Sequence, residues 1–521
     1  MMLLLPISYD MDTILILKYV TFFLLAYFTL KHTILRSKLK GKLPPSPFLS
    51  FPIIGHLYLF KKPLHRSLAR LASEYGPVLY LRMGSRPVLL LSSPSAVEEC
   101  LVRNDVFVDR PRLLPGKHGG NNYTNMAWSP YGDHWKNLRR IAAVEILSPN
   151  RLQILSGIRA EVARSFIRRI MKASSENGGV VEMKSAIFGL TLDNMMRMLM
   201  GKSNYEEASE GNEASRRFQQ IVEGSFRVSG VNNLEDFLPI LKWFRVFLGS
   251  PEDFMRKLTK EKNEFMRGLM KEHRELERED KLSDGRKRAM IHVLLSLQKE
   301  DPQYYSDDMI GSLILALFQG GTDTSAATVE WVLSLLLNNP EVMKKAQAEI
   351  DTNIGHNRLV EESDKNNIPY LQNIINETLR MYPTGPIGLP RESRNDSQVG
   401  DYHIPKGSML IYNIWAIQND PEIWDEPRIF RPERFDGVEG TRLGCKYMPF
   451  GTGKRICPGE HLASKVIWLA VAILIQCFEW ERFDKELITM EESGGVSLTK
   501  VVPLKVKCRP RPCMMNVLSQ L

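Results

Sequence analysis

The feature of the sequence best suited to chemistry is a cysteine in a glycine-rich segment near the C-terminus. Residues 450–459 read FGTGKRICPG, so that Phe450 opens the segment and Arg455 precedes Cys457 by two positions. Glycines let the backbone approach a flat group closely and leave N–H groups free to point at sulfur. A thiolate held in this way can be the axial ligand of a haem iron, where it donates electron density and favours O–O cleavage. The alternative is a buried free cysteine beside a turn.

An acid and an alcohol stand side by side within a long apolar run. Asp323 and Thr324 follow Gly320 and Gly321, in a helical pattern that begins near Leu313. Two glycines and hydroxyl residues inside a helix weaken its hydrogen-bond ladder and can open a local bulge. A carboxylate and a hydroxyl beside such a gap can hold water and relay protons. The alternative is a helix kink with capping-type residues.

Two further pairs of polar residues share helix faces. Glu377 and Arg380 are three positions apart. Trp135 and Arg139 are four positions apart. Each pair therefore lies on one face of a predicted helix. Surface ion pairs contribute little to stability, and a core tryptophan beside a surface arginine is the commoner explanation of the second pair. A Pro-Glu-Arg-Phe segment at residues 432–435 supplies another cation downstream.

The elements that must position these residues are mostly helices. Long amphipathic segments cover residues 130–172, 182–201, 211–230, 251–276, 302–337, 339–353 and 366–381. Two short β-like runs, at residues 78–82 and 87–91, form a predicted hairpin, and a third lies at 408–415. The predicted fold class is therefore mainly α with a small β region.

Composition limits the class of partner. The 521 residues include 69 Lys and Arg against 60 Asp and Glu, a formal net charge of +9. No basic run is interleaved with aromatic residues, so nucleic acid is not a predicted partner. The six cysteines form no CxxC pair and show no zinc-site spacing with a histidine. They do not suggest a disulfide scaffold, and we expect the body of the protein in a reducing compartment.

The N-terminal region carries a predicted membrane anchor. Residues 14–30 are strongly apolar apart from Lys18, and four basic residues follow between positions 36 and 42. By the positive-inside rule, the body of the protein then faces the cytosol. The alternative, a cleaved signal peptide, lacks a small-residue cleavage site. Translation could begin at Met1 or at Met11.

The cysteine segment resembles the signature of the cytochrome P-450 haem-thiolate monooxygenases, and the other motifs follow in the order typical of that family. The resemblance implies that Cys457 is the axial ligand of the iron of haem b and that Phe450 shields the sulfur from water. It also implies that Thr324 hydrogen-bonds bound O2 while Asp323 admits protons from solvent. The haem propionates are expected to contact Trp135, Arg139, Arg391 and Arg455.

The same resemblance assigns a structural role to a charge network. It implies that Glu377, Arg380 and Arg434 pair in the interior and hold the cysteine segment in place. Losing one partner of such a network would cost roughly 3–5 kcal/mol, because a buried charge would be left unpaired. The sequence departs from the family's pattern at Gly320, where alanine is frequent, and at Ile456, where a smaller residue is common. Neither departure removes a chemical group.

Plant microsomal members look most similar, in particular those acting on flavonoids, isoflavonoids, lignans and related aromatic or terpenoid metabolites. The resemblance implies a cytochrome P-450 fold behind a single transmembrane helix in the endoplasmic reticulum membrane. It also implies an apolar substrate, O2, and electrons from NADPH through a reductase, with cytochrome b5 as a second partner. The predicted parts are a luminal tail and anchor, a basic and proline-rich hinge, and a cytosolic catalytic domain, over residues 1–35, 36–50 and 51–521. The expected pocket walls are residues 110–125, 216–245, 315–320, 384–389 and 494–496.

Two other functions stay open at this point. One keeps the haem but catalyses oxidative coupling, ring closure or isomerisation. The other is a non-catalytic haem sensor or membrane scaffold, which leaves the acid–alcohol pair unexplained. Family members that only rearrange peroxides or couple phenols can lack the threonine, so the presence of Thr324 favours O2 activation.

Overall fold

The computed structural model describes residues 42–176, 178–202, 233–244, 251–279, 289–438 and 440–521, with a few isolated positions outside these ranges. The predicted anchor over residues 14–30 and the predicted helix over 211–230 lie almost wholly outside the described residues. Among the residues that are described, one helix has the length and apolar composition of a membrane span, α17 (Glu460–Cys477), and it is mostly buried within the fold.

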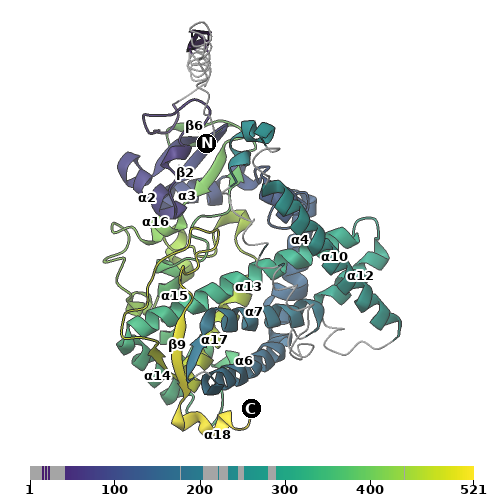
Figure 1. Cartoon of the computed structure of the whole chain (residues 1–521), viewed down its shortest axis with the longest axis vertical. Helices are drawn as coiled ribbons and strands as arrows, with labels where there is room; N and C mark the ends of the chain where they lie inside the picture. The colour runs from purple at the N-terminus through teal and green to yellow at the C-terminus, as the bar shows by residue number, and fades with distance from the viewer. Residues whose placement is uncertain are drawn as a thin grey trace, which may run out of the picture.

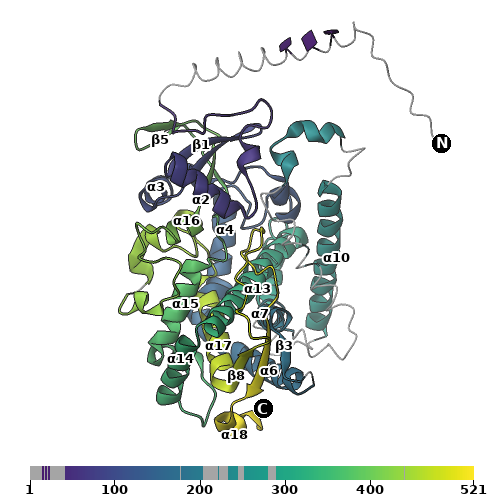
Figure 2. The same ribbon diagram turned by 60° about the vertical axis from the view of Figure 1, so that its left-hand side comes forward.

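Helices dominate the structure, as Figures 1 and 2 show, and confirm the predicted fold class. Besides α17 they are α2 (Leu64–Tyr75), α3 (Pro94–Glu98), α4 (Asp133–Ala142), α5 (Pro149–Ile154), α6 (Ser156–Glu176), α7 (Met183–Met200), α10 (Pro251–Arg278), α12 (Met290–Glu300), α13 (Asp307–Asn338), α14 (Pro340–Asn353), α15 (Pro369–Met381), α16 (Ile414–Gln418) and α18 (Met515–Leu518).

The strands form small sheets at the margins of the helical region. They are β1 (Val78–Met83), β2 (Arg86–Leu91), β3 (Val180–Glu182), β4 (Arg391–Glu392), β5 (Ser397–Val399), β6 (Tyr402–Ile404), β7 (Met409–Tyr412), β8 (Phe478–Arg482) and β9 (Lys505–Pro510). One sheet has the order β1-β2-β7-β4, another β3-β9-β8, and β5 pairs with β6. The predicted hairpin is confirmed as antiparallel β1 and β2, and the predicted third strand as β7.

Helix α13 crosses the middle of the helical region (Figure 1). The Ser306 hydroxyl caps its first turn by accepting a hydrogen bond from Met309 N at 3.3 Å. Apolar residues occur on nearly every side of the helix because α7, α10, α15 and α17 all pack against it. Gly321 permits the close approach of α7, since a Cβ there would lie 2.6 Å from Met195 Sδ. The bulge expected at Gly320 and Gly321 is absent, and the helix is continuous through both glycines.

The largest difference from the predicted elements lies in residues 130–172, which we expected to be one helical segment. The structure divides this stretch into α4, a π-helical turn over Ala143–Leu147, α5 and α6. Pro149 cannot donate to the preceding turn, and Ser148 instead caps a new helix by accepting from Arg151 N at 3.3 Å. The chain can therefore change direction twice within the segment.

Candidate active site

The cysteine segment forms a tight loop directly before α17. Cys457 N donates to Phe450 O at 2.9 Å and closes the loop. Gly453 has a φ of 70°, and a Cβ there would lie 1.9 Å from Leu101 O, so only glycine fits. The loop thus delivers the sulfur to the N-terminus of α17, where free backbone N–H groups favour negative charge.

The Cys457 side chain is exposed on the wall of a cavity, although many protein atoms surround it. Burial raises the pKa of this thiol above its ordinary value, and the Glu460 carboxylate adds to the effect. The backbone N–H groups of Gly459 and Glu460 and the guanidinium of Arg139 act in the opposite direction. These donors prepare the site for a sulfur that carries negative charge, which a coordinated metal ion would enforce.

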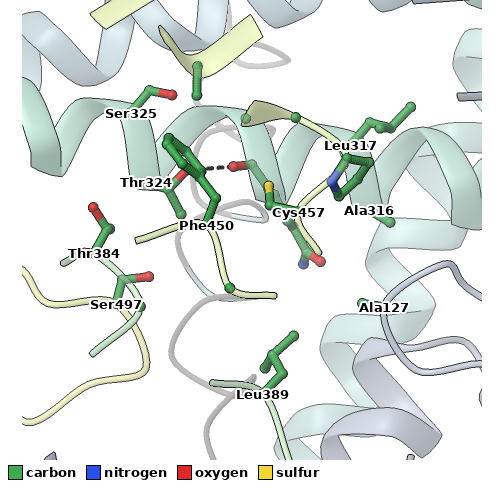
Figure 3. A pocket seen from close by; sticks show the side chains of 18 of the residues that line it. Ala127, Ala316, Leu317, Thr324, Ser325, Thr384, Leu389, Phe450, Cys457 and Ser497 are labelled. Carbon is green, nitrogen blue, oxygen red and sulfur yellow. Dashed lines mark hydrogen bonds between the residues drawn. The ribbon is translucent and has the colours of Figure 1, made fainter. Parts of the chain in front are cut away.

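The cavity has a volume of about 400 Å³ and lies between the cysteine loop and α13. Figure 3 shows Cys457 and Phe450 facing the segment of α13 that carries Thr324. The lining is mainly apolar, with a small number of hydroxyl and amide groups. Apolar walls with few polar groups are typical of sites that bind small molecules.

The Thr324 hydroxyl reaches this cavity from α13. It donates a hydrogen bond to Gly320 O at 2.6 Å, which leaves the hydroxyl oxygen able to accept from another group. Asp323 is half-buried and is not among the residues that line the cavity. The structure therefore brings Thr324 beside the cysteine loop and leaves Asp323 on the adjacent face of the helix.

Three guanidinium groups, those of Arg110, Arg391 and Arg455, gather next to the cysteine loop. Each donates to a backbone carbonyl oxygen at 2.7 Å. Burial, together with the charge of the neighbouring Arg391, lowers the pKa of Arg455 to about 9. Burial and then the charges of Arg455 and Arg391 hold the pKa of Arg110 well below its ordinary value. Such a cluster of buried cations is costly unless an anion joins it.

Two nitrogens of this cluster have no hydrogen-bond partner among the described residues. They are Arg391 Nε and Arg455 Nη1, and both are buried. A haem carries two carboxylates, which would supply the missing acceptors and the missing negative charge. The arginines and the Cys457 thiol therefore fit a haem, with its carboxylates toward the arginines.

Trp135 lies on α4 between two of the cations. Its ring centroid is 5.5 Å from the guanidinium carbon of Arg139 and 4.7 Å from that of Arg455. The indole N–H donates to Met126 O at 3.1 Å, and Arg139 Nη1 donates to Ile456 O at 2.8 Å. For the indole N–H to contact a propionate, it would first have to give up its hydrogen bond to Met126 O.

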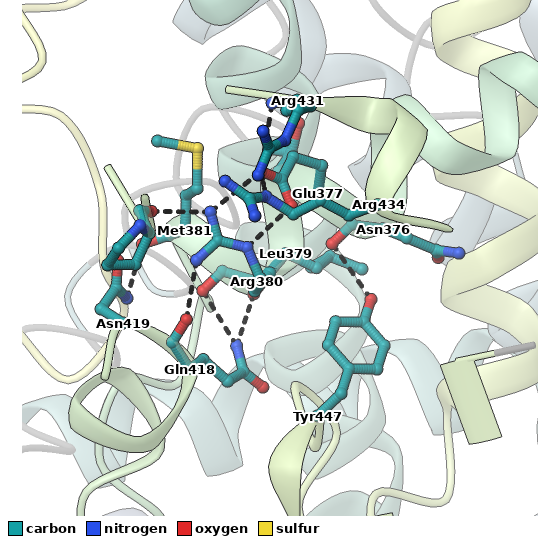
Figure 4. Close-up of polar contacts among 12 residues, drawn as sticks. Asn376, Glu377, Leu379, Arg380, Met381, Gln418, Asn419, Arg431, Arg434 and Tyr447 are labelled. Atoms are coloured by element: carbon teal, nitrogen blue, oxygen red, sulfur yellow. Dashed lines mark hydrogen bonds and ion pairs between the residues drawn. The ribbon is translucent and has the colours of Figure 1, made fainter. Parts of the chain in front are cut away.

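The Glu377, Arg380 and Arg434 side chains meet in the interior, as Figure 4 shows. Arg380 Nε and Nη2 donate to the two carboxylate oxygens of Glu377 at 2.7 and 2.9 Å, and both side chains are 0% exposed. Arg434 Nε donates to Glu377 Oε1 at 3.1 Å. A fourth residue connects this network to the cysteine loop: Gln418 accepts from Met448 N at 2.8 Å, and its carbonyl oxygen accepts from Arg380 Nη1 at 2.7 Å.

The structure thus brings many of the predicted site residues to one cavity. Its lining includes Trp135, Arg139, Thr324, Phe450, Arg455 and Cys457. Arg391, Asp323 and the Glu377 network are not part of the lining. Of the expected pocket walls, most of residues 216–245 lie outside the described residues, whereas parts of the other four segments line the cavity.

Sequence reasoning assigned no individual role to two residues of this region, Arg110, which lies at the start of an expected pocket wall, and Gln418. Arg110 donates to Ala127 O and Leu389 O and lines the cavity, yet it belongs to no recognised motif. Gln418 is 0% exposed and ends the short helix α16, which begins within the last two residues of the β-like run predicted at 408–415. Their contacts involve residues far away in the sequence, so no local pattern could identify them.

Comparisons with known proteins agree with this geometry. A family model described as "Cytochrome P-450" matches residues 44–508. Isoflavone 2'-hydroxylase of Glycyrrhiza echinata is 41% identical over 514 residues, which is 98% of this chain and 100% of that protein. A (+)-piperitol/(+)-sesamin synthase of Sesamum radiatum is 40% identical over 491 residues, covering 92% and 93% of the two chains. The solved structure of a zebra fish cytochrome P-450 with progesterone has a TM-score of 0.74 at 22% identity, covers 86% of this chain and 100% of that one, and shows the same fold.

Proposed function

The chain belongs to the cytochrome P-450 family, whose members are haem-binding monooxygenases, and we propose that it inserts one oxygen atom of O2 into an apolar plant secondary metabolite. The relatives named above include an isoflavone hydroxylase and a lignan-type synthase, which supports an aromatic or phenolic substrate, with terpenoids as the other class. The observation that carries the proposal is the arrangement of the Cys457 thiol and the Thr324 hydroxyl on one apolar cavity.

We assign the cofactor contacts to this chain's own residues. Cys457 would be the axial ligand of haem b, and Phe450 would keep water from the sulfur. The propionates would be held by Arg455, Arg391 and Arg110, with the α4 pair Trp135 and Arg139 beside them. When bound, a haem with a cysteinate ligand supplies the redox chemistry that cleaves the O–O bond. The buried arginines with unpartnered nitrogens support this placement.

Proton delivery is assigned to α13. The Thr324 hydroxyl can exchange its hydrogen bond to Gly320 O for one to a group in the cavity, and so hold a proton there. Asp323, half-buried at the preceding position, would admit protons to this hydroxyl from outside the cavity. Glu377, Arg380 and Arg434, with Gln418, would keep the cysteine loop in position while these groups act.

The cellular setting is part of the proposal. We infer a luminal tail and anchor over residues 1–35, a hinge over 36–50 and a cytosolic catalytic domain over 51–521, attached to the endoplasmic reticulum membrane. Electrons would come from NADPH through a cytochrome reductase, with cytochrome b5 as an additional donor. The family model begins at residue 44, directly after the basic and apolar N-terminal region, which supports this division.

Isotope labelling tests the proposed reaction. Purified holoenzyme with reductase and NADPH would be incubated under ¹⁸O₂ with a panel of isoflavones, lignans and terpenoids. We expect a product that carries one ¹⁸O atom, because the reaction inserts oxygen from O2. A product that contains no ¹⁸O, such as a coupled dimer or an isomer, would contradict monooxygenation and favour the coupling or rearranging function.

A further inference from the structure

A pair of threonine hydroxyls lines the cavity one turn beyond Thr324. Thr328 Oγ1 lies 2.9 Å from Thr324 O and 2.8 Å from Thr384 Oγ1. Thr328 is 2% exposed and Thr384 is 7% exposed, and both border the cavity. Figure 3 shows Thr384 beside Ser497, on the side of the cavity next to the C-terminal part of α13.

The direction of these hydrogen bonds follows from the number of protons available. A threonine hydroxyl has one proton, and a carbonyl oxygen can only accept. The Thr328 hydroxyl therefore donates its one proton to Thr324 O. The hydrogen bond between the two hydroxyls then requires Thr384 to donate to Thr328. Thr384 Oγ1 is left with lone pairs and no proton, so it faces the cavity as an acceptor only.

This acceptor is held rigidly. Thr384 O accepts from Leu498 N at 2.8 Å, and Leu498 O accepts from Trp331 Nε1 of α13 at 2.7 Å. The Trp331 ring in turn stacks on Tyr382, with centroids 4.2 Å apart and planes inclined by 11°. Two segments distant in sequence are thereby fixed to one face of α13. Thr328 lies four residues beyond Thr324 on α13, about 6 Å along the helix axis at a rise of 1.5 Å per residue, and its contact with Thr384 fixes the Thr384 hydroxyl at that level of the helix.

We propose that Thr384 Oγ1 accepts a hydrogen bond from a phenolic hydroxyl of the substrate and thereby selects phenols over their methyl ethers. The proposal rests on the proposed function, because it takes the substrate to occupy this cavity. Other polar side chains, such as Asn194 and Ser497, also line the cavity, but a hydroxyl that enters beside Thr384 meets an oxygen that can only accept. A methyl ether has no proton to donate and would leave the Thr384 oxygen unpaired. The cost of an unpaired buried polar group corresponds to about tenfold or more in affinity.

Binding constants for matched ligand pairs test the selection. The holoenzyme would be titrated with 7-hydroxyisoflavone against 7-methoxyisoflavone, and with 4'-hydroxyisoflavone against 4'-methoxyisoflavone. Dissociation constants would be measured by equilibrium dialysis and by the shift of the resting haem spectrum. We expect at least one pair in which the phenol binds about tenfold or more tightly than the ether.

Three variants separate this role from a merely structural one. Thr384→Val keeps the shape but removes the acceptor, so it should weaken binding of the phenol, and it should strengthen binding of the ether because no oxygen is left unpaired. Thr384→Ser keeps the acceptor and should restore the preference. Thr328→Val removes the partner to which Thr384 donates, so the Thr384 proton becomes available to an ether oxygen and the ether should bind more tightly than to the unmodified enzyme.

Several outcomes would overturn the inference. Equal affinity of the unmodified enzyme for phenol and ether in both pairs would do so, as would an unchanged ratio in Thr384→Val. Failure to bind any of the four compounds, in enzyme with an intact carbon monoxide spectrum, would also contradict it. If the unmodified enzyme shows no such carbon monoxide spectrum, the proposed function is contradicted instead. The failure of the inference can therefore be distinguished from the failure of the proposed function.

Discussion

At the scale of single residues, the Thr324 hydroxyl is the group whose removal should be most informative. We predict that Thr324→Ala lowers the rate of product formation about 10²-fold, while NADPH oxidation falls much less. The reason is that the alanine cannot hold a proton at the cavity, so electrons from NADPH are lost to reduced oxygen species. Product formed per NADPH consumed measures the effect.

Thr324→Ser is the matched control, because it keeps a hydroxyl that can bond Gly320 O. It should recover most of the coupling between NADPH use and product. Equal coupling in the alanine variant and the unmodified enzyme would contradict a proton role for this hydroxyl.

Residues could be predicted from the sequence when their surroundings were local. The cysteine loop depends on glycines within a few positions of Cys457, and Glu377 and Arg380 meet because a helix repeats every 3.6 residues. The roles of the Arg110 and Gln418 side chains could not be predicted, because their partners Leu389 and Met448 come from distant segments. The orientation of the Trp135 N–H toward Met126 depends on a loop conformation that no spacing encodes.

At the scale of elements, α13 carries two adjacent glycines with different surroundings. A Cβ at Gly320 would meet nothing within 4 Å, whereas one at Gly321 would press on Met195 of α7. We predict that Gly320→Ala stabilises the protein by about 0.5–1 kcal/mol, because alanine loses less backbone entropy in a helix. Gly321→Ala should be less stable than Gly320→Ala, because the displaced Met195 offsets the gain at a cost of about 1–3 kcal/mol.

Denaturation followed by circular dichroism, with both variants measured in parallel, tests this difference. Equal stabilisation by the two alanines would contradict the packing described for α7 against α13. Gly320 also borders the cavity, so its alanine should narrow the space beside Thr324 without disturbing α7.

The same scale shows why some elements escaped prediction. Long apolar or amphipathic periodicity identified α7, α10, α13 and α14 nearly to their ends. In residues 130–172 the periodicity continued across Pro149, so the breaks between α4, α5 and α6 were not recognised. The sheet of β3, β9 and β8 joins strands more than 300 positions apart in sequence, Val180 against Lys507 for example, and short strands of this kind carry little pattern of their own.

At the scale of the whole molecule, the fold assembles one apolar cavity from segments spread over most of the chain. The loop before α4, the middle of α13, the segment after α15 and the cysteine loop each contribute part of its lining. The same assembly brings Arg110, Arg391 and Arg455 together, and the Asp109 carboxylate offsets only part of the burial and like-charge effects on Arg455, so an anionic cofactor would stabilise the arrangement. The cavity therefore carries a thiol on its wall and a cationic cluster beside it, which are the two kinds of group that could hold the iron and the carboxylates of a haem.

The most direct test is the carbon monoxide difference spectrum of the reduced protein, recorded for the unmodified enzyme, Cys457→Ser and Cys513→Ser. Cys513 is an exposed free cysteine outside the cavity and serves as the matched control. We predict the Soret band of a thiolate-ligated haem in the unmodified enzyme and in Cys513→Ser, and its loss in Cys457→Ser. A band of unchanged position and intensity in Cys457→Ser would contradict ligation through this sulfur.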